Sequence, residues 1–453
     1  MADVSLFNAL GCAVRIDTSG LSAGDAQHIE HAWSGARCAA GDPIPTAHLT
    51  VPVRPQSSLR NTLSSLSQQV TLAAIRARRG QLWMLHATGV ADSAGRVVAL
   101  IGPSGQGKTT AAAALSRHYG YVSDETVGID PQGAVLPYRK PLSVIEDADS
   151  AKVQRSPEEL GLLPLPQAPL RLAALVLLDR RADGPDEPVL EACDVGEALE
   201  HLVGQTSYLA DVPAPLRMIA AHAAATGGVR RIVYREAETL ASAIAPLFQE
   251  PSPPVVEESA IDARQTSGAP GIYRGPYLDA LPLDDPDRIA LLQPNATGPA
   301  YYRLVAGIGP ALWRAAAGST PTDLHDAAVR SYGAPEGVDV AAAVETAIRA
   351  LTDDGVLADE PTWRIRPDVA TTGHDDRFLA LALSDLLHPT PVALEGSAAV
   401  IWSLLASARA VTATELLEAI AAQTGATPDQ IDDDVRSFLD MLEAGSLAER
   451  IAP

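Results

Sequence analysis

The sequence predicts an α/β domain of the phosphate-loop type, followed by two small winged-helix domains of the α+β class. A glycine-rich loop, Gly102–Thr110, lies between an apolar strand and an alanine-rich helical stretch. A proline-rich and charged segment at 251–270 marks a linker. Beyond it, Trp313 and Trp402 each begin a similar run of predicted helices, which indicates an internal repeat. We therefore expect one domain over 1–250 and two modules after the linker.

The domain over 1–250 shows strands alternating with helices, which is typical of α/β folds, and residues 1–70 form its N-terminal extension. Two strands, Leu82–Val90 and Val97–Ile101, are joined by a turn at Asp92–Gly95, where Asp and Gly favour a tight turn. Continuous apolar residues over Leu172–Leu178 predict a strand that is buried on both faces. The remaining elements are two helices, Val70–Arg78 and Pro215–Ala225, a late strand, Arg231–Tyr234, and a closing helix, Ala237–Phe248.

The glycine-rich loop fits the pattern G-x-x-x-x-G-K-[ST] without a mismatch. In such a loop, successive backbone N–H groups point at phosphate oxygens, and the N-terminus of the next helix adds positive charge. Lys108 would reach the β- and γ-phosphates, and the Thr109 hydroxyl would ligate Mg²⁺. The chain has three lysines against 31 arginines, so the general composition of the chain does not explain a lysine at this place. The nucleotide is expected at Gly102, Ser104, Gly105, Gln106, Gly107, Lys108, Thr109 and Thr110.

A second acid has to accompany the loop if phosphate is to be transferred, and two positions compete for that role. Asp179 ends the predicted buried strand, which is the usual place of the metal-binding acid in such domains. Asp124 and Glu125 follow a short strand, Tyr121–Ser123, one helix and one turn after Lys108. That short connection returns the chain to the mouth of the loop, so we favour Asp124 and Glu125. For Asp179, the alternative is an ordinary strand-end residue beside two arginines.

Composition excludes several classes of protein and of partner. The net charge is −22, and residues 251–453 carry 30 acids against 13 bases, which disfavours nucleic acid as a partner. No apolar stretch approaches the roughly 18 residues of a membrane span, and the N-terminus lacks the pattern of a signal peptide. The three cysteines lie far apart and form neither a disulfide framework nor a zinc site. We expect a cytoplasmic protein without a membrane partner.

The two modules, at 271–365 and 371–453, share one order of elements. Each has about three helices, ends in a glycine followed by a short apolar wing, and is preceded by a predicted hairpin, Tyr277–Leu292 or Phe378–Val392. This is the pattern of a small winged helix. Winged helices commonly bind DNA, but the acidic run Asp432–Asp434 argues against DNA here.

Three segments resemble the C-terminal kinase domain of HPr kinase/phosphorylase, which has a phosphoenolpyruvate-carboxykinase-like fold. They are Leu85–Val90, the glycine-rich loop, and Tyr121–Val127. A later segment, Val135–Ser143, is similar to one common in the HPr-kinase-like branches of the family. The likeness covers residues 70–250, and it implies ATP together with Mg²⁺ held by Thr109 and Asp124.

The resemblance also implies roles for single residues. Asp124 matches the acid that takes the proton from the serine hydroxyl receiving phosphate, and Glu125 stands where the family has a second aspartate. With Lys108, both are expected to be catalytic. His86 matches the histidine on the strand before the loop, and it fits a catalytic role and a hydrogen-bonded strand histidine equally. Arg139 and Lys140 are expected to grip phosphate or the acceptor, with plain surface charge as the alternative.

The two modules resemble PqqD, the precursor-peptide recognition element of ribosomal-peptide biosynthesis. The likeness runs from Tyr302 to Leu357 in the first copy and from Leu394 to Leu447 in the second, and it includes the tryptophan and the terminal glycine–leucine pattern. It implies that an unstructured leader peptide adds as a strand to the hairpin edge, with its side chains against a helix. Scaffolding repeats are the alternative, and one copy can bind while the other supports.

Together these features predict a kinase that uses ATP and Mg²⁺ to phosphorylate a serine or threonine hydroxyl of a ribosomally made precursor peptide. The modules would hold the leader. Two alternatives stay open: a kinase of a small molecule such as serine or a sugar, and a nucleotide-gated peptide chaperone without catalysis. HPr kinases form oligomers, so the resemblance is also compatible with a homo-oligomer.

Overall fold

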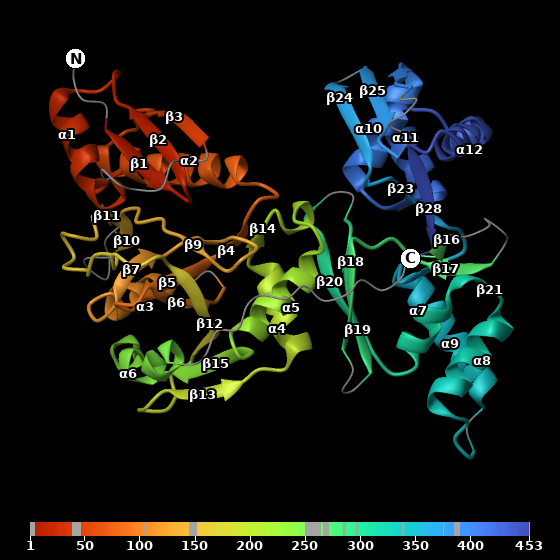
Figure 1. Cartoon of the computed structure of the whole chain (residues 1–453), viewed down its shortest axis with the longest axis horizontal. Coiled ribbons are helices and arrows are strands. Elements are labelled where there is room, and N and C mark those ends of the chain that lie inside the picture. The colour runs from red at the N-terminus through yellow and green to blue at the C-terminus, as the bar shows by residue number, and fades with distance from the viewer. Residues whose placement is uncertain are drawn as a thin grey trace. The chain divides into compact units, whose positions relative to one another are not determined.

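The computed structural model describes residues 5–38, 47–103, 105–144, 152–249, 264–265, 271–283, 287–295, 298–337, 339–374, 376–384 and 390–452. The chain divides into two compact units, Met1–Glu258 and Ser259–Pro453 (Figure 1). Ser104 lies outside the described residues, as does all of the linker 251–270 except residues 264 and 265. Within the described part of the chain, no helix is long and apolar enough to cross a membrane.

A six-stranded mixed sheet forms the centre of the first unit and positions the glycine-rich loop. Its strands are β5 (Ala87–Ala91), β6 (Arg96–Ile101), β7 (Gly120–Ser123), β12 (Arg171–Arg180), β13 (Val189–Ala192) and β15 (Val229–Tyr234). Their order is β13-β15-β12-β6-β5-β7, with β6, β12 and β15 parallel and the others antiparallel to their neighbours. The apolar residues predicted as a buried strand lie in β12 and are buried, which confirms that prediction.

Helices α3 (Lys108–Leu115) and α6 (Leu240–Ile244) pack on this sheet through a shared apolar core. The sequence predicted one closing helix over Ala237–Phe248, and that prediction is wrong. In the structure, short 3-10 turns at Ala237–Thr239 and Ala245–Phe248 flank α6. Pro246 explains the break, because it lacks the N–H that the next α-helical hydrogen bond needs.

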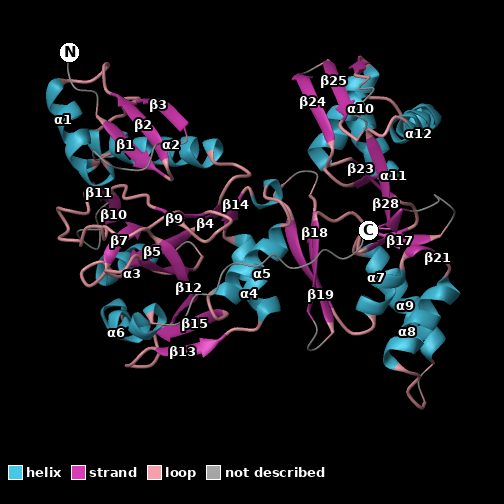
Figure 2. Cartoon of the chain, viewed as in Figure 1, coloured by secondary structure: helices cyan, strands magenta, loops and turns pink. Residues whose placement is uncertain are grey.

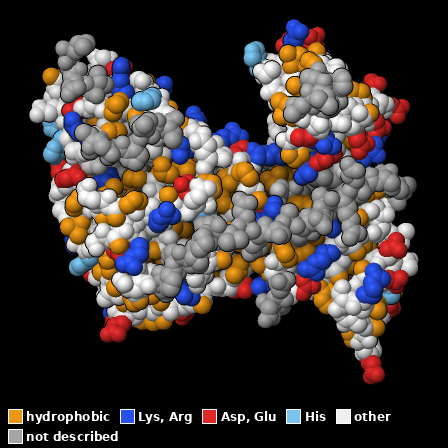
Figure 3. All heavy atoms as spheres, in the orientation of Figure 1, with side chains coloured by type: hydrophobic (Ala, Val, Ile, Leu, Met, Phe, Trp, Pro, Cys, Tyr) orange, Lys and Arg blue, Asp and Glu red, His pale blue; other side chains and the backbone are white. Residues whose placement is uncertain are grey.

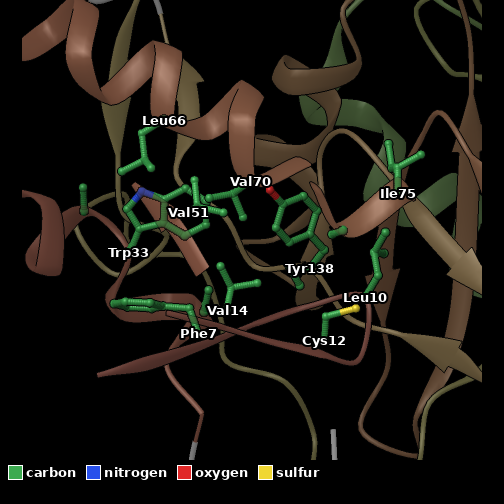
Figure 4. Packing of buried hydrophobic residues seen from close by; sticks show 14 of the residues in the cluster. Phe7, Leu10, Cys12, Val14, Trp33, Val51, Leu66, Val70, Ile75 and Tyr138 are labelled. Carbon is green, nitrogen blue, oxygen red and sulfur yellow. The ribbon is translucent and has the colours of Figure 1, made fainter. Parts of the chain in front are cut away.

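The N-terminal residues form a second layer of the first unit. Its elements are β1 (Leu6–Ala9), β2 (Cys12–Asp17), α1 (Ala23–Ala32), β3 (Ala47–Pro52) and α2 (Leu59–Ala77). Their core gathers around Phe7 and Trp33, whose rings meet edge to face at 6.1 Å, and it includes Tyr138 from a later loop (Figure 4). Helix α2 begins well before the predicted Val70, because the Ser58 hydroxyl caps it by accepting a hydrogen bond from the Asn61 N–H.

Smaller elements complete the first unit. They are β4 (Trp83–Leu85), β8 (Val127–Ile129), β9 (Val135–Leu136), β10 (Leu142–Val144), β11 (Val153–Arg155), α4 (Val195–Gly204), β14 (Thr206–Ser207) and α5 (Pro215–Ala225), with 3-10 turns at Ser34–Ala36 and Leu209–Asp211. Strand β4 belongs to a separate sheet of order β14-β4-β8-β9. The single strand predicted over Leu82–Val90 is therefore two strands, and the chain passes from one sheet to the other at His86.

The second unit repeats one order of elements twice (Figure 2). The first copy holds β17 (Ile272–Arg274), β18 (Asp279–Leu283), β19 (Arg288–Gln293), β20 (Tyr301–Val305), α7 (Gly309–Ala315), β21 (Ala317–Ser319), α8 (Pro321–Tyr332), α9 (Val340–Asp353) and β22 (Leu357–Ala358). The second holds β23 (Thr362–Ile365), β24 (Val369–His374), β25 (Arg377–Ala382), β26 (Val392–Glu395), α10 (Ser397–Ala408), β27 (Val411–Thr412), α11 (Ala413–Thr424), α12 (Pro428–Ala444) and β28 (Ala448–Ala452). A short strand, β16 (Arg264–Gln265), pairs with β28.

The two copies also share their sheets and the position of their tryptophans. Each has a three-stranded meander, β18-β19-β20 or β24-β25-β26, where the sequence predicted a hairpin of two strands. Trp313 and Trp402 are both fully buried in the cores of their copies. Strand β23 falls inside the range 271–365 assigned to the first module, yet it pairs with β27 and β28. The second copy therefore begins at Thr362, earlier than the predicted residue 371.

The acidic run that argues against DNA lies on α12. Asp433 and Asp434 are exposed there, with Asp429 in the first turn of the same helix. Acidic side chains gather over this part of the second unit in Figure 3. A negative surface of this kind repels a phosphate backbone.

Candidate nucleotide site

The glycine-rich loop begins where β6 ends, and β6 lies between β12 and β5 in the central sheet. It leads directly into α3, whose first residue is Lys108. Gly105 and Gly107 have φ values of +87° and +83°, in the left-handed region that a residue with a Cβ rarely adopts. These two turns let the backbone curl in front of the N-terminus of α3, which is the arrangement that binds phosphate.

Lys108 is buried, and its ammonium donates hydrogen bonds to the carbonyl oxygens of Gly102 and Pro103. Burial lowers the pKa of Lys108, and the carboxylates of Asp124 and Glu125 oppose part of that change. The ammonium is thus held over the loop by neutral carbonyl groups, which it can exchange for the oxygens of a phosphate.

Asp124 lies beside the start of α3, because β7 returns the chain to the loop. The Thr109 hydroxyl donates to Asp124 Oδ2 at 3.2 Å, and the Tyr121 hydroxyl donates to Oδ1 at 3.0 Å. Burial, and then the charge of Asp124, raise the pKa of Tyr121 well above its usual value, so the phenol remains a donor. Asp124 is itself only 5% exposed.

The competing acid, Asp179, is not among the residues that line the cleft in front of the loop. Its carboxylate pairs with Arg181 at the end of β12, at an N–O distance of 2.6 Å. Hydrogen bonds from Arg181 lower the pKa of Asp179. This geometry favours Asp124 over Asp179 as the acid that accompanies the loop.

Lys140 forms ion pairs with both predicted acids. Its ammonium lies 3.1 Å from Asp124 Oδ1 and 3.3 Å from Glu125 Oε2, and the residue is 4% exposed. Burial acts against the charge of Lys140, but Asp124 and Glu125 outweigh it and raise the pKa of the ammonium. Glu125 Oε2 also accepts a hydrogen bond from the Thr71 hydroxyl of α2 at 3.3 Å. Lys140 therefore orients two carboxylates at the mouth of the loop.

His86 faces the same cleft from the point where the chain changes sheets. Its backbone N–H donates to the Gln205 carbonyl at 2.7 Å, which fixes the crossing point. Burial, and then the positive charge of Lys108, lower the pKa of His86, while a hydrogen bond with the Glu125 backbone acts in the other direction. A lowered pKa keeps the imidazole neutral near pH 7.

A cleft of about 580 Å³ opens in front of the loop and joins most of the predicted residues. It is lined by His86, Gly105, Gly107, Lys108, Thr109, Thr110, Ala113, Asp124, Glu125, Lys140, Ser143, Val144 and Lys152. Gly102 and Gln106 belong to the loop without lining the cleft.

Arg139 is not brought to the cleft, so its predicted role in phosphate or acceptor binding is not supported by its position. Its guanidinium donates to the carbonyl oxygens of Gly35, Tyr121 and Leu163 and pairs with Glu158 at 3.0 Å. These partners come from three separate segments of the first unit, because Glu158 and Leu163 belong to one loop. Arg139 thus ties the strand before Asp124 to the surrounding loops.

Sequence reasoning missed four residues that line the cleft, namely Ala113 of α3, Ser143 and Val144 of β10, and Lys152, which immediately precedes β11. Ala113 and Val144 carry no local signal, and Ser143 is only the last residue of the segment Val135–Ser143. Lys152 could have been found, because the scarcity of lysine singled out Lys108 and applies equally to the other two lysines of the chain.

The oxygens of Thr109 and Asp124 fit a Mg²⁺ ion. The described residues hold no group of three or more His, Cys, Asp or Glu that could bind a metal ion by themselves. Mg²⁺ at a nucleotide keeps several waters and phosphate oxygens, so it needs only one or two protein oxygens. Thr109 Oγ1 and Asp124 Oδ2 supply such a pair 3.2 Å apart.

Comparisons with known proteins identify one part of the second unit. Residues 386–447 match the family of coenzyme PQQ synthesis protein D (PqqD), so the chain carries a PqqD-like module there. Among solved structures, the chain is similar to the HPr(Ser) kinase/phosphatase from Coxiella burnetii, with 14% identity over 37% of this chain and 93% of that chain. The TM-score is 0.19, which carries no argument about the fold, so the interpretation of the first unit rests on its loop and neighbouring residues. No curated protein matches the chain.

Proposed function

We propose that this protein is an ATP- and Mg²⁺-dependent kinase that phosphorylates a serine or threonine hydroxyl of a ribosomally made precursor peptide. The observation that carries the proposal is the contact between Thr109 and Asp124 at the mouth of a phosphate loop. A carboxylate at that place can ligate the metal and accept a proton. The PqqD-like module at 386–447, on the same chain, supports a peptide as the acceptor.

In the proposed reaction, Asp124 accepts the proton of the acceptor hydroxyl. The hydroxyl oxygen forms a bond to the γ-phosphorus while the bond from that phosphorus to the β,γ-bridging oxygen breaks, and ADP leaves. Lys108 and the loop amides offset the negative charge of the phosphates throughout. Mg²⁺, when bound, would neutralise further phosphate charge as a Lewis acid.

Three neighbours are proposed to organise this step. Lys140 holds the carboxylates of Asp124 and Glu125 in fixed orientations through its two ion pairs. His86, neutral because its pKa is lowered by burial, can hydrogen bond to the acceptor without adding charge to the cleft. Transfer of a phosphoryl group depends mainly on such positioning, because the protein performs little covalent chemistry.

The module at 386–447 is proposed to bind the leader of the precursor. The first copy, which has the same order of elements, is proposed as a second module of winged-helix type. Binding the leader on the same chain would raise the local concentration of the acceptor near Asp124 without any new contact in the cleft.

The direct test supplies the chain with γ-labelled ATP, Mg²⁺ and the precursor peptide encoded beside it. Label is expected on the peptide. Asp124→Asn should still bind ATP and should lose transfer, whereas Asp179→Asn, a matched change of the competing acid, should retain both. Peptide that stays unlabelled, together with steady label transfer to a free amino acid, contradicts the proposal.

A shortened chain that ends at Glu258 separates the alternatives, because Met1–Glu258 is a compact unit. Peptide phosphorylation should collapse on this truncation. Activity on free serine or a sugar that survives it would indicate a small-molecule kinase. A third outcome is that the chain delivers the precursor to another enzyme. If this delivery requires Lys108 but is unaffected by Asp124→Asn, the chain is a nucleotide-gated chaperone.

A further inference from the structure

All three lysines of this chain line one cleft. The sequence uses arginine for its other 31 basic side chains, yet Lys108, Lys140 and Lys152 are all among the thirteen residues that line the cleft in front of the phosphate loop. Lys108 belongs to the loop motif, and Lys140 is paired with two carboxylates. Neither role accounts for Lys152, which lies 44 positions beyond the loop lysine.

The backbone of Lys152 is held beside the cleft by a strand pair. Lys152 immediately precedes β11, and the register of β11 on β10 pairs Val153 with Val144. The next residue, Gln154, is buried, donates to the Ser143 hydroxyl and accepts from Ser67 of α2 at 3.4 Å. Because Ser143 and Val144 themselves line the cleft, this pairing places Lys152 at its edge.

The distribution of charge in the cleft indicates that a further cation is needed to neutralise the phosphates. The ammonium of Lys140 is engaged by Asp124 and Glu125, so it neutralises protein charge rather than phosphate charge. Apart from Lys140, the cations that line the cleft are Lys108 and Lys152, while a transferring phosphoryl group spreads negative charge over three oxygens. A lysine suits this place because its compact ammonium is a point charge on a thin stem, whereas the arginine fork is planar and broad.

We propose that Lys152 is a substrate-contacting residue whose ammonium binds the γ-phosphoryl group of the nucleotide opposite Lys108. This inference rests on the proposed kinase function and adds a residue to its site. During transfer, the bond from the γ-phosphorus to the bridging oxygen breaks and the bond to the acceptor oxygen forms. The proton goes to Asp124, and Lys152 keeps its own protons throughout.

Amine labelling tests the position of Lys152 without relying on catalysis. An acyl-phosphate derivative of ATP carries its reactive carbonyl just beyond the γ-phosphate, and it acylates a nearby lysine Nζ while ATP leaves. With only three lysines in the full chain, mass spectrometry assigns each label without ambiguity. Lys152 should be labelled, and excess ATP should protect it. Lys140 should stay unlabelled, because its ammonium is buried and paired with Asp124 and Glu125.

Two labelling outcomes would overturn the role of Lys152 while leaving the proposed kinase function untouched. One is labelling of Lys108 without Lys152, and the other is labelling of Lys152 that excess ATP does not reduce. Binding of a fluorescent ATP analogue to the unmodified chain is measured in parallel. If that analogue does not bind, the proposed kinase function falls and this inference falls with it.

Kinetics supply the second test. Lys152→Gln should lower kcat for phosphate transfer by about 100-fold, as loss of one preorganised charge at a transition state does, with a smaller change in KM for ATP. Lys152→Arg should recover part of that loss. Arg117→Gln is the matched control, because Arg117 is an exposed cation two residues beyond the end of α3 and outside the cleft, and it should leave kcat unchanged. An unchanged kcat in Lys152→Gln overturns the inference.

Discussion

Replacing Lys140 by methionine should strongly destabilise the first unit, because two carboxylates would lose their shared cation. Lys140 is 4% exposed, and its ammonium lies 3.1 Å from Asp124 and 3.3 Å from Glu125. Removing one partner of a buried ion pair costs about 3–5 kcal/mol. The Glu125 side chain is 32% exposed and can regain water, so the lower end of that range applies. We expect a loss of about 3 kcal/mol in the free energy of unfolding.

Hydrogen exchange in urea, resolved by peptide mass spectrometry, measures this loss in each unit separately. Amides of α2 and β7 report on the first unit, and those of α10 and α12 report on the second unit as an internal control. The triple variant Lys140→Met, Asp124→Asn, Glu125→Gln removes all three charges and should recover most of the lost stability. A loss below about 1 kcal/mol, the size expected of an exposed pair, or an equal loss in the triple variant, would refute the reasoning.

Three further predictions concern catalysis, acid stability and the arginine behind the site. Asp124→Asn should lower the rate of phosphate transfer by about 10²–10⁴-fold with ATP affinity retained, as measured by label transfer and by fluorescent-nucleotide binding. Burial lowers the pKa of His222 from 6.5 to about 4, so the folded chain binds fewer protons than the unfolded chain between these values. The free energy of unfolding of the first unit should therefore fall by about 3 kcal/mol as the pH falls from 6.5 to 4. His222→Phe keeps a ring stacked on Trp83 and should remove most of this pH dependence. Urea unfolding followed by hydrogen exchange measures both. Arg139→Met should destabilise the first unit by about 3 kcal/mol without raising the KM for ATP in the folded fraction. A raised KM would instead indicate that Arg139 contacts the substrate.

Local patterns were enough to predict the glycine-rich loop and its place between a strand and a helix. The loop lies between β6 and α3 as predicted, because glycine spacing and the neighbouring apolar and alanine runs act over a few residues. The position of Asp124 beside the loop was also accessible, since one short helix and one turn link it to Lys108. On the two competing acids the structure adds one observation: Asp179 pairs with Arg181, whereas Asp124 lines the cleft.

Neighbouring residues in one segment show where sequence reasoning stopped. Arg139 and Lys140 are adjacent and both basic, so the sequence assigned them the same role. In the structure, Lys140 enters the cleft and Arg139 binds carbonyl groups behind it. Nothing in the segment's composition separates the two side chains, because their partners come from segments distant in the sequence.

The sequence by itself determined the glycine-rich loop, the short connection that returns the chain to Asp124, and the twofold repeat of the second unit. Each of these depends on spacing within one continuous segment, which a single chain displays directly. The tertiary structure alone decided that His86 marks a change of sheet, that the second copy begins at Thr362, and that three scattered lysines line one cleft. These features depend on strand pairing and register between remote segments, and local sequence patterns do not encode which remote segments will meet.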